Sequence, residues 1–314
     1  MKEITIKNLI ENLETNCGVS REELSKVVTW REEHPIGEEL EHLVPKPKVF
    51  YRGTALRVAM YSILANQHLI LTGSKGAGKN TLIDTLAYLF HRPLYQFPFN
   101  ADIDVSMIVG NDTLSIDENG HQIISFRKHQ LVQAMESGAW FVGDEINMTR
   151  SDVLSVLHMV TDHRNVLDYP SLGKVTSNPG FKFIGTMNYG YMGTKELNEA
   201  FGDRFAIVQV DTCRDNIFTE MLKDRYDISD KAAKEFFKLY TDLEQKATRS
   251  EISSKAVSIR GILSAIELHK AGLDLDTALE VNVINKTFDE TERKEIKDVI
   301  STYFAYDIFD KGGK

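Results

Sequence analysis

Residues 73–81 place three glycines and a lysine in the order Gly-x-x-Gly-x-Gly-Lys, between a short apolar segment and a helical one. Such glycines let the main chain curl so that successive amide hydrogens point at one phosphate group, and the following helix amino terminus adds partial positive charge. Lys79 is expected to bridge the β- and γ-phosphates of ATP. A glycine-rich turn that merely contains a lysine is disfavoured by the apolar segments on both sides. The predicted nucleotide-binding residues are Gly73, Ser74, Lys75, Gly76, Ala77, Gly78, Lys79, Asn80 and Thr81.

One position departs from the usual pattern of such a loop. The residue after the lysine is ordinarily Ser or Thr, whose hydroxyl ligates Mg²⁺, but here it is Asn80. An amide oxygen also ligates a hard cation, so Asn80 is expected to be a metal ligand. Thr81 lies about 100° further around the helix and is a poorer candidate. ATP and Mg²⁺ are therefore the predicted cofactors, and a reduced Mg²⁺ affinity or turnover stays open.

A pair of carboxylates follows an apolar strand about 65 residues beyond the phosphate loop. Residues 140–142 are Trp-Phe-Val, and after Gly143 come Asp144 and Glu145. Asp144 is expected to hold Mg²⁺ through water, and Glu145 to orient and deprotonate the attacking water. Alone, this pattern is more often a strand that runs into a solvated loop. The phosphate loop upstream favours the catalytic interpretation.

A polar residue ends a third predicted strand. Residues 181–186 are mostly apolar and lead into Thr-Met-Asn, which places Asn188 just beyond the strand. Asn188 is expected to hydrogen-bond the γ-phosphate or the attacking water. Its alternative is a turn-forming asparagine at a strand end.

The order of predicted elements indicates the fold class. Short apolar strands at 68–72, 93–97, 140–142, 181–186 and 206–210 alternate with helical patterns, and residues 213–314 show helical spacing with no convincing strand. Parallel strands need such crossover helices. The sequence therefore predicts an α/β fold, with a parallel sheet sandwiched by helices and a C-terminal all-helical lid.

The same patterns suggest three segments: a helical segment 1–48, an α/β core 49–212 and a helical domain 213–314. Two insertions in the core, 113–126 and 166–180, carry hairpin turn signals. Surface loops are the alternative at both places.

Composition limits the partners and the compartment. Acidic residues (46) outnumber basic ones (37), and the net charge of −9 disfavours nucleic acid and anionic membrane surfaces. No apolar stretch is long enough to cross a bilayer. Two cysteines suit a reducing compartment, so we expect a cytoplasmic protein.

In this order the motifs resemble the AAA+ ATPases, and specifically the MoxR-related group of CbbQ, NorQ and GvpN type proteins, with their dynein-related AAA domain. The resemblance covers roughly residues 50–300 and also rests on the segments 157–164, 185–191, 196–205 and 258–260. It implies nucleotide and hydrolysis roles for Lys79, Asp144 and Glu145, and the sensor 1 role for Asn188. Similar proteins form hexameric rings that remodel a protein client, often alongside a partner with a von Willebrand type A domain.

Two arginines acquire roles through this resemblance. Arg204 matches the arginine finger, which reaches the γ-phosphate bound by the neighbouring subunit, and Arg260 matches the sensor 2 arginine of the lid. On sequence alone Arg204 would be an ordinary surface ion-pair residue, and Arg260 a residue that solvates a lid helix.

The expected function is a ring-forming ATPase that remodels or activates a protein partner. One alternative is a nucleotide-gated assembly scaffold with little turnover, because of Asn80. Another is a nucleic-acid-directed motor subunit, which would show salt-sensitive binding. A small-molecule kinase would leave the sensor residues and the helical lid unexplained.

Overall fold

The computed structural model describes residues 13–15, 17–46, 53–116, 118, 120–188, 199–211, 215–254, 256–304 and 308, with the main chain alone for Asp215 and Asn216. The chain divides into two compact units, an α/β unit that holds most residues up to Val210 and a helical unit that begins at Asp211. Each unit is described by itself. The predicted boundaries 1–48, 49–212 and 213–314 stay predictions.

A parallel five-stranded sheet forms the centre of the α/β unit. Its strand order is β2-β5-β8-β1-β9, and each neighbouring pair runs parallel. The strands are β1 (His68–Thr72), β2 (Leu94–Pro98), β5 (Trp140–Asp144), β8 (Lys182–Met187) and β9 (Phe205–Gln209). All five strands were predicted from the sequence, and the predicted parallel α/β fold is confirmed.

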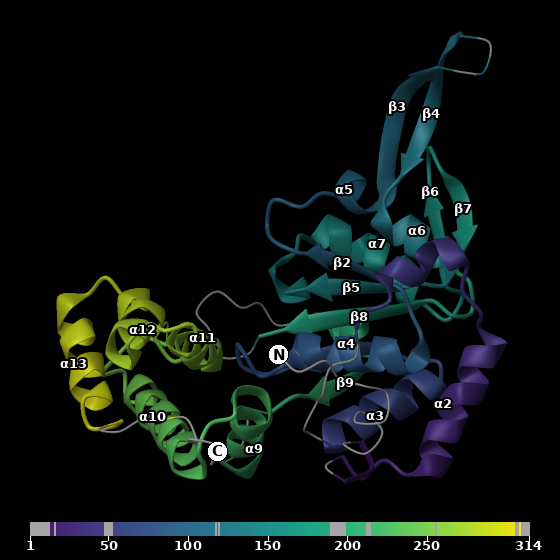
Figure 1. The fold of residues 1–314 in the computed structure, drawn as a ribbon. Coiled ribbons are helices and arrows are strands. Elements are labelled where there is room, and N and C mark those ends of the chain that lie inside the picture. Colours follow the sequence, from purple (N-terminus) through teal and green to yellow (C-terminus); the bar gives the residue numbers. More distant parts are fainter. Residues whose placement is uncertain are drawn as a thin grey trace. The chain divides into compact units, whose positions relative to one another are not determined.

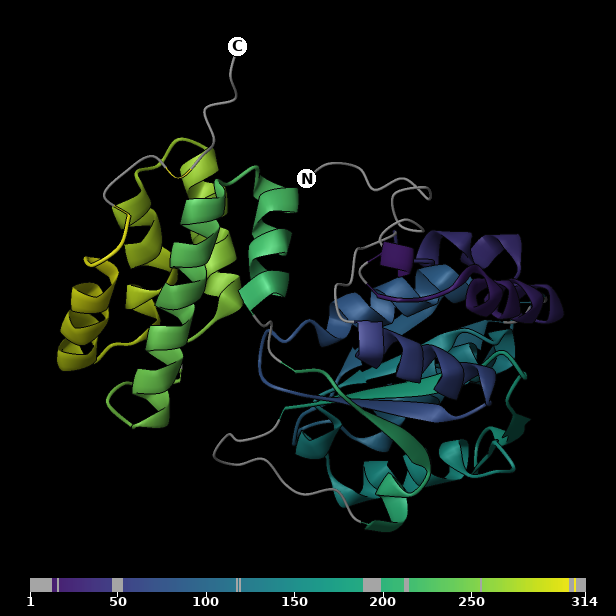
Figure 2. The same ribbon diagram turned by 90° about the horizontal axis from the view of Figure 1, so that it is seen from below.

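Helices cover both faces of this sheet (Figures 1 and 2). The ring of Trp140 lies 5.6 Å from that of Phe90 in α4 (Lys79–Phe90). The next residue, Phe141, belongs instead to a core cluster with side chains of α6 (Gln130–Ser137) and α7 (Ser151–Thr161). Neighbouring side chains of a strand point to opposite faces, so α4 covers one face, and α6 and α7 cover the other.

The amino-terminal helix α2 (Arg21–Glu33) packs onto the α/β unit. It begins with a capping box in which the Ser20 hydroxyl accepts from the Glu23 amide and the Glu23 carboxylate accepts from the Ser20 amide. Its Trp30 ring lies edge-on to Phe90, 5.0 Å away. The 3₁₀ helix η1 (Glu38–Leu43) follows, and α3 (Gly53–Leu64) then leads into β1. Within residues 1–48 the described helical stretches are 13–15, Arg21–Glu33 and Glu38–Leu43.

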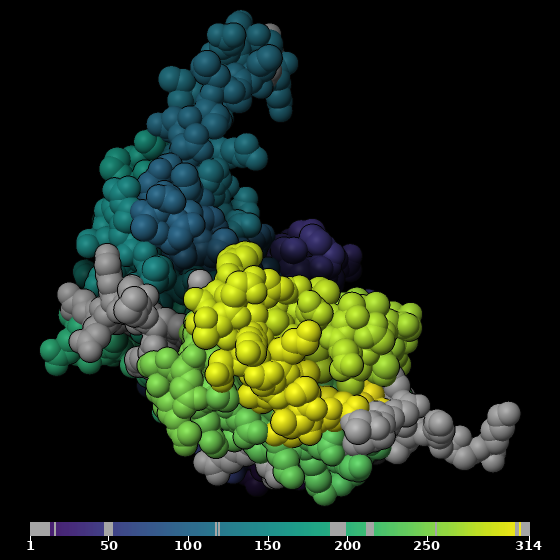
Figure 3. All heavy atoms as spheres, turned by 90° about the vertical axis from the view of Figure 1, so that its left-hand side faces the viewer, coloured from purple at the N-terminus to yellow at the C-terminus, as the bar shows by residue number. Residues whose placement is uncertain are grey.

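Both insertions that carry turn signals are antiparallel hairpins. The first consists of β3 (Gly110–Ile116) and β4 (Gln122–Lys128), preceded by the short helix α5 (Val105–Val109). It projects clear of the rest of its unit (Figures 1 and 3). Its Leu114 and Ile124 pair across the strands and are 76% and 75% exposed. The second consists of β6 (Val166–Tyr169) and β7 (Gly173–Thr176). The 3₁₀ helix η2 (Ile146–Met148) and the short helix α8 (Glu199–Gly202) complete the unit.

In the described residues the C-terminal unit is helical, without a strand, as predicted. Its helices are α9 (Asp215–Tyr226), α10 (Asp230–Thr248), α11 (Ile259–Lys270), α12 (Leu275–Asn282), η3 (Ile284–Lys286) and α13 (Glu290–Ile300). Phe218 of α9 stacks on Tyr240 of α10 in their shared core. None of the helices in the described part of the chain is long and apolar enough to span a bilayer.

Candidate active site

The phosphate loop links β1 to α4 and requires glycine at two of its turns. Gly76 has a φ of 81°, and Gly78, the residue that caps α4, has a φ of 90°. Side-chain-bearing residues rarely adopt this left-handed region, which glycine enters without cost. The glycine spacing in the sequence thus matches the turns that the main chain makes before the helix starts at Lys79.

Lys79 is buried and held by three oxygen atoms. Its ammonium donates to the carbonyls of Gly73 (2.8 Å) and Ser74 (3.0 Å), and to Oδ1 of Asn188 (2.8 Å). The lysine therefore lies against the loop and already contacts the end of β8. A bound phosphate would replace these neutral oxygens as the partner of the Lys79 ammonium.

Asn188 joins Lys79 to the predicted general base. While its Oδ1 accepts from Lys79, its Nδ2 donates to Oε1 of Glu145 at 2.8 Å. Residues from α4, β8 and the end of β5 thus form one hydrogen-bonded chain, Lys79–Asn188–Glu145. The structure brings these three predicted site residues together.

Asp144 is positioned by a residue that the sequence analysis did not assign. The hydroxyl of Thr186 in β8 donates to Oδ1 of Asp144 (2.9 Å) and accepts from the amide of Glu145 (3.2 Å). Thr186 therefore fixes both acidic residues at once. The signal that could have found it is a threonine at the end of an otherwise apolar strand.

A glycine slot shapes the turn between the two carboxylates. Gly143 of β5 and Gly185 of β8 are register partners. A Cβ on Gly143 would meet Phe99 at 2.6 Å and Ile146 at 2.9 Å, and a Cβ on Gly185 would meet Ile146 at 2.5 Å. Glu145 between them has a φ of 57°, a left-handed conformation that costs a non-glycine residue about 1–2 kcal/mol. The turn folds Ile146 back onto both glycines, and this packing holds Glu145 at the sheet edge.

Two side chains near the loop carry oxygen atoms that suit a Mg²⁺ ion. Asn80 Nδ2 lies 3.5 Å from Oδ2 of Asp144. Because amide nitrogen and oxygen can exchange by a side-chain flip, Asn80 can present its oxygen beside the carboxylate. Mg²⁺ is commonly held by one or two carboxylates, waters and substrate phosphates. Asn80 and Asp144 would supply the protein ligands, and the described residues contain no group of three His, Cys, Asp or Glu suited to another metal.

Neither predicted arginine takes part in the described hydrogen bonds of this chain. Arg204, just before β9, donates through Nη1 to the carbonyl of Ala200, and its buried Nε has no partner in the described structure. Burial, and then the nearby charge of Arg204, lower the pKa of His158. Arg260 is exposed in the first turn of α11 in the helical unit. The finger and sensor roles of these arginines stay predictions.

Comparison with known proteins places these features in a group. Residues 68–205 match the family described as the AAA domain of the dynein-related subfamily. The chain is 32% identical over 241 residues to an uncharacterised protein of Staphylococcus saprophyticus, which covers 76% of this chain and 91% of that protein. It is 29% identical over 282 residues to the uncharacterised protein YojN of Bacillus subtilis, covering 89% and 92%. A crystal structure of a candidate ATPase from Cytophaga hutchinsonii aligns with a TM-score of 0.42 at 14% identity, over 92% of this chain and 88% of that one, which is too weak a similarity to support a conclusion.

Proposed function

Because the chain belongs to the AAA+ ATPase family, through a domain of the dynein-related subfamily, we propose that it hydrolyses ATP within a homo-oligomeric ring and remodels a protein partner. The observation that carries this proposal is the chain of hydrogen bonds from Lys79 through Asn188 to Glu145. It joins a cation for phosphate binding to a carboxylate for water activation. A simple phosphate-binding turn has no use for the second group.

Each residue of this chain has a task that its position allows. The Lys79 ammonium neutralises charge on the β- and γ-phosphates, since it stands at the amino terminus of α4. Glu145 orients the attacking water and accepts its proton. Asn188 bonds both side chains, so a change at the γ-phosphate reaches Glu145 through one amide group.

The carboxylate of Asp144 and the amide of Asn80 would hold Mg²⁺. The bound ion would neutralise charge on the phosphate oxygens. Thr186 keeps one Asp144 oxygen engaged, which leaves the other directed toward Asn80. We therefore propose that Asn80 replaces the usual hydroxyl ligand.

Ring formation and the partner are proposed on the basis of the Arg204 side chain and the resemblance to MoxR-related proteins. Arg204 has an unpaired Nε and no hydrogen bond to the phosphate-loop residues of its own chain among the described residues. A fixed guanidinium supplied by a neighbour would stabilise the developing γ-phosphate charge. The proposed ring is hexameric, with a protein client in the cytoplasm and a von Willebrand type A protein as a candidate partner. The buried Cys17 side chain is a thiol, which is consistent with a reducing compartment.

The test is the Mg²⁺-dependent ATPase rate per subunit as a function of protein concentration. In a shared active site the rate climbs with concentration, and Arg204→Ala lowers it by about 10³-fold or more while nucleotide binding remains. Arg249→Ala, a change at an exposed arginine at the end of α10, is the matched control. A rate that is independent of concentration and unaffected by Arg204→Ala would contradict the ring mechanism.

The nucleotide-gated scaffold remains the second candidate, since Asn80 occupies the metal-ligand position. This hypothesis predicts that ATP promotes assembly and that the ATPase rate of the wild type is no higher than that of Glu145→Gln. A wild-type rate well above that variant excludes it.

A further inference from the structure

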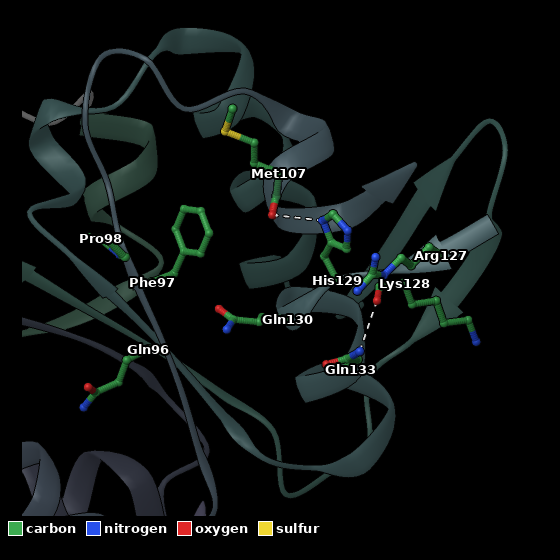
Figure 4. Close-up of a pocket in the computed structure, with 9 residues that line it drawn as sticks. All are labelled: Gln96, Phe97, Pro98, Met107, Arg127, Lys128, His129, Gln130 and Gln133. Carbon is green, nitrogen blue, oxygen red and sulfur yellow. Dashed lines mark hydrogen bonds between the residues drawn. The ribbon is translucent and has the colours of Figure 1, made fainter. Parts of the chain in front are cut away.

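A groove at the edge of the sheet carries a chemistry that the proposed ATPase mechanism does not use. It has a volume of about 510 Å³ and is lined by nine residues. They come from β2, α5, the end of β4 and the start of α6 (Figure 4): Gln96, Phe97, Pro98, Met107, Arg127, Lys128, His129, Gln130 and Gln133. All of these elements belong to the α/β unit.

One wall of the groove is the open edge of the sheet. Strand β2 is the last strand in the sheet order. The residues just before and after β2 are hydrogen-bonded to β5. Trp140 donates to the Pro93 carbonyl, and Phe99 donates to the Asp144 carbonyl. Pairing alternates along a parallel strand, so Leu94 and Gln96 direct their peptide groups away from β5. No described strand pairs with them, and the side chain of Gln96 is exposed.

The opposite wall is positively charged. None of the nine described lining residues is acidic. The ammonium of Lys128 is paired with Glu136 at 2.6 Å, whereas the exposed Arg127 has no ion pair in the described structure. Helix α6 begins at this wall, and its capping residue His129 makes no side-chain capping bond. A carboxylate near this helix start and Arg127 would be favoured.

The remaining lining residues suit an extended main chain. Gln96 and Gln130 each offer a donor and an acceptor, which match peptide groups, whereas Gln133 already donates to the Lys128 carbonyl at 3.1 Å. Phe97 and Met107, which is 46% exposed, add apolar surface to the lining of the groove. The whole chain has a net charge of −9, so this positive wall is a local exception.

We propose that this groove binds an extended, acidic segment of a protein partner, which pairs with the free edge of β2 and directs carboxylates toward Arg127 and the start of α6. Strand addition supplies affinity through main-chain hydrogen bonds, and the side-chain positions supply specificity. A nucleic acid fits less well, because it offers no strand-pairing groups and only one unpaired basic side chain would face it. The inference deepens the proposed function by naming the chemistry of the partner.

The experiment measures binding of a fluorescein-labelled peptide of alternating valine and glutamate to the full chain without nucleotide. About eight residues suffice, since a strand advances ~3.3 Å per residue. The comparison peptides are valine–lysine of the same length, and valine–glutamate with N-methylated alternate amides. The protein variants are Arg127→Glu and, as the matched control, Arg249→Glu.

We expect saturable binding of the valine–glutamate peptide to the wild type and to Arg249→Glu. Arg127→Glu should weaken it by about fivefold or more, because an attraction becomes a repulsion at an exposed site. The lysine peptide and the N-methylated peptide should fail to bind. Equal affinity for both charge types, or for the N-methylated peptide, would overturn the proposal.

Two further results would also overturn it. One is the absence of any peptide binding. The other is preferential binding of a single-stranded thymidine oligonucleotide with a steep salt dependence, which would assign the groove to nucleic acid. Because ATP is absent throughout, failure here leaves the ATPase test untouched, and an inactive ATPase leaves this binding test valid.

Discussion

The two ends of the central sheet each hold a lysine in the same arrangement of oxygen atoms. At the carboxyl end, Lys79 donates to two main-chain carbonyls and to Oδ1 of Asn188. At the amino end, Lys182 donates to the carbonyls of Pro179 and Phe181 and to Oδ1 of Asn66. Both side chains are buried. The local hydrogen bonding therefore does not distinguish the lysine proposed to bind phosphate from a structural one.

The surrounding charges do distinguish them. The chain of bonds from Lys79 leads to the carboxylate of Glu145, next to Asp144. Around Lys182 the described neighbours are cationic or neutral: burial, and then the charge of Arg92, lower the pKa of Lys182 to about 8. Burial, followed by the charge of Lys182, lowers the pKa of His68 to about 4, against the hydrogen bond that His68 Nε2 donates to Oδ1 of Asn165. One end combines a lysine with two carboxylates, and at the other end burial and neighbouring positive charges lower the pKa of both Lys182 and His68.

The largest expected difference is in nucleotide affinity. Lys79→Met should lower the affinity for a fluorescent ATP analogue by about tenfold to a hundredfold, because a charged hydrogen bond is worth about 1.5–3 kcal/mol. Lys182→Met, the same substitution at the other end, should leave this affinity within about twofold. Similar losses in both variants would mean that the ends are not functionally distinct.

The next effect is on the pH dependence of stability. Between the folded pKa of about 8 and the unfolded value of 10.5, the unfolded chain binds the Lys182 proton that the folded chain has released. The free energy of unfolding therefore rises with pH in this window. Urea denaturation should show it rising from pH 8 to pH 10 by about 2 kcal/mol more in the wild type than in Lys182→Met.

The subtraction is needed because burial raises the pKa of the Cys17 thiol to about 12, which lowers stability as the pH rises above 9 in both proteins. At pH 7, below this window, the difference between wild type and variant should be nearly independent of pH. A difference that stays flat or falls up to pH 10 would show that Lys182 keeps its proton in the folded chain.

The smallest effect concerns the metal ligand. Asn80→Ser should lower the Mg²⁺ concentration for half-maximal ATPase activity severalfold, on the order of threefold, because a hydroxyl no longer places an amide N–H against Asp144. Nucleotide binding in EDTA should not change. Thr81→Ser, one residue further along the helix, serves as the control. A higher Mg²⁺ requirement in Asn80→Ser would show that the native amide is the better ligand.

The strands were predictable because each is a short apolar run between helical patterns. Their boundaries differ by only one or two residues, as with β8, which starts at Lys182 instead of 181. Lys79, Glu145 and Asn188 could be predicted to meet because the carboxyl ends of parallel strands lie at one edge. The hydrophobic pattern of each strand is a local property of the sequence, so it can be recognised without knowledge of tertiary contacts.

Other contacts were beyond the reach of a pattern. The bond of Lys182 to Asn66 spans 116 residues, and a lysine in a strand ordinarily indicates a solvent-facing position. The sequence indicated only that Thr186 belongs to a strand. The role of its hydroxyl depends on Asp144, which lies in the neighbouring strand. Likewise the packing of Trp30 on Phe90 depends on where helix α2 docks, which the helical spacing of α2 does not specify.

The glycine slot beneath Ile146 has a consequence for how this protein can change over time. Gly143 and Gly185 would both stand out in a saturation mutagenesis screen as intolerant sites, although neither has a side chain to touch a nucleotide. A methyl group at either would displace Ile146 and, with it, the turn that presents Glu145. A smaller residue at 146 would therefore have to precede any replacement of Gly185, and at Gly143 the ring of Phe99 would have to move as well.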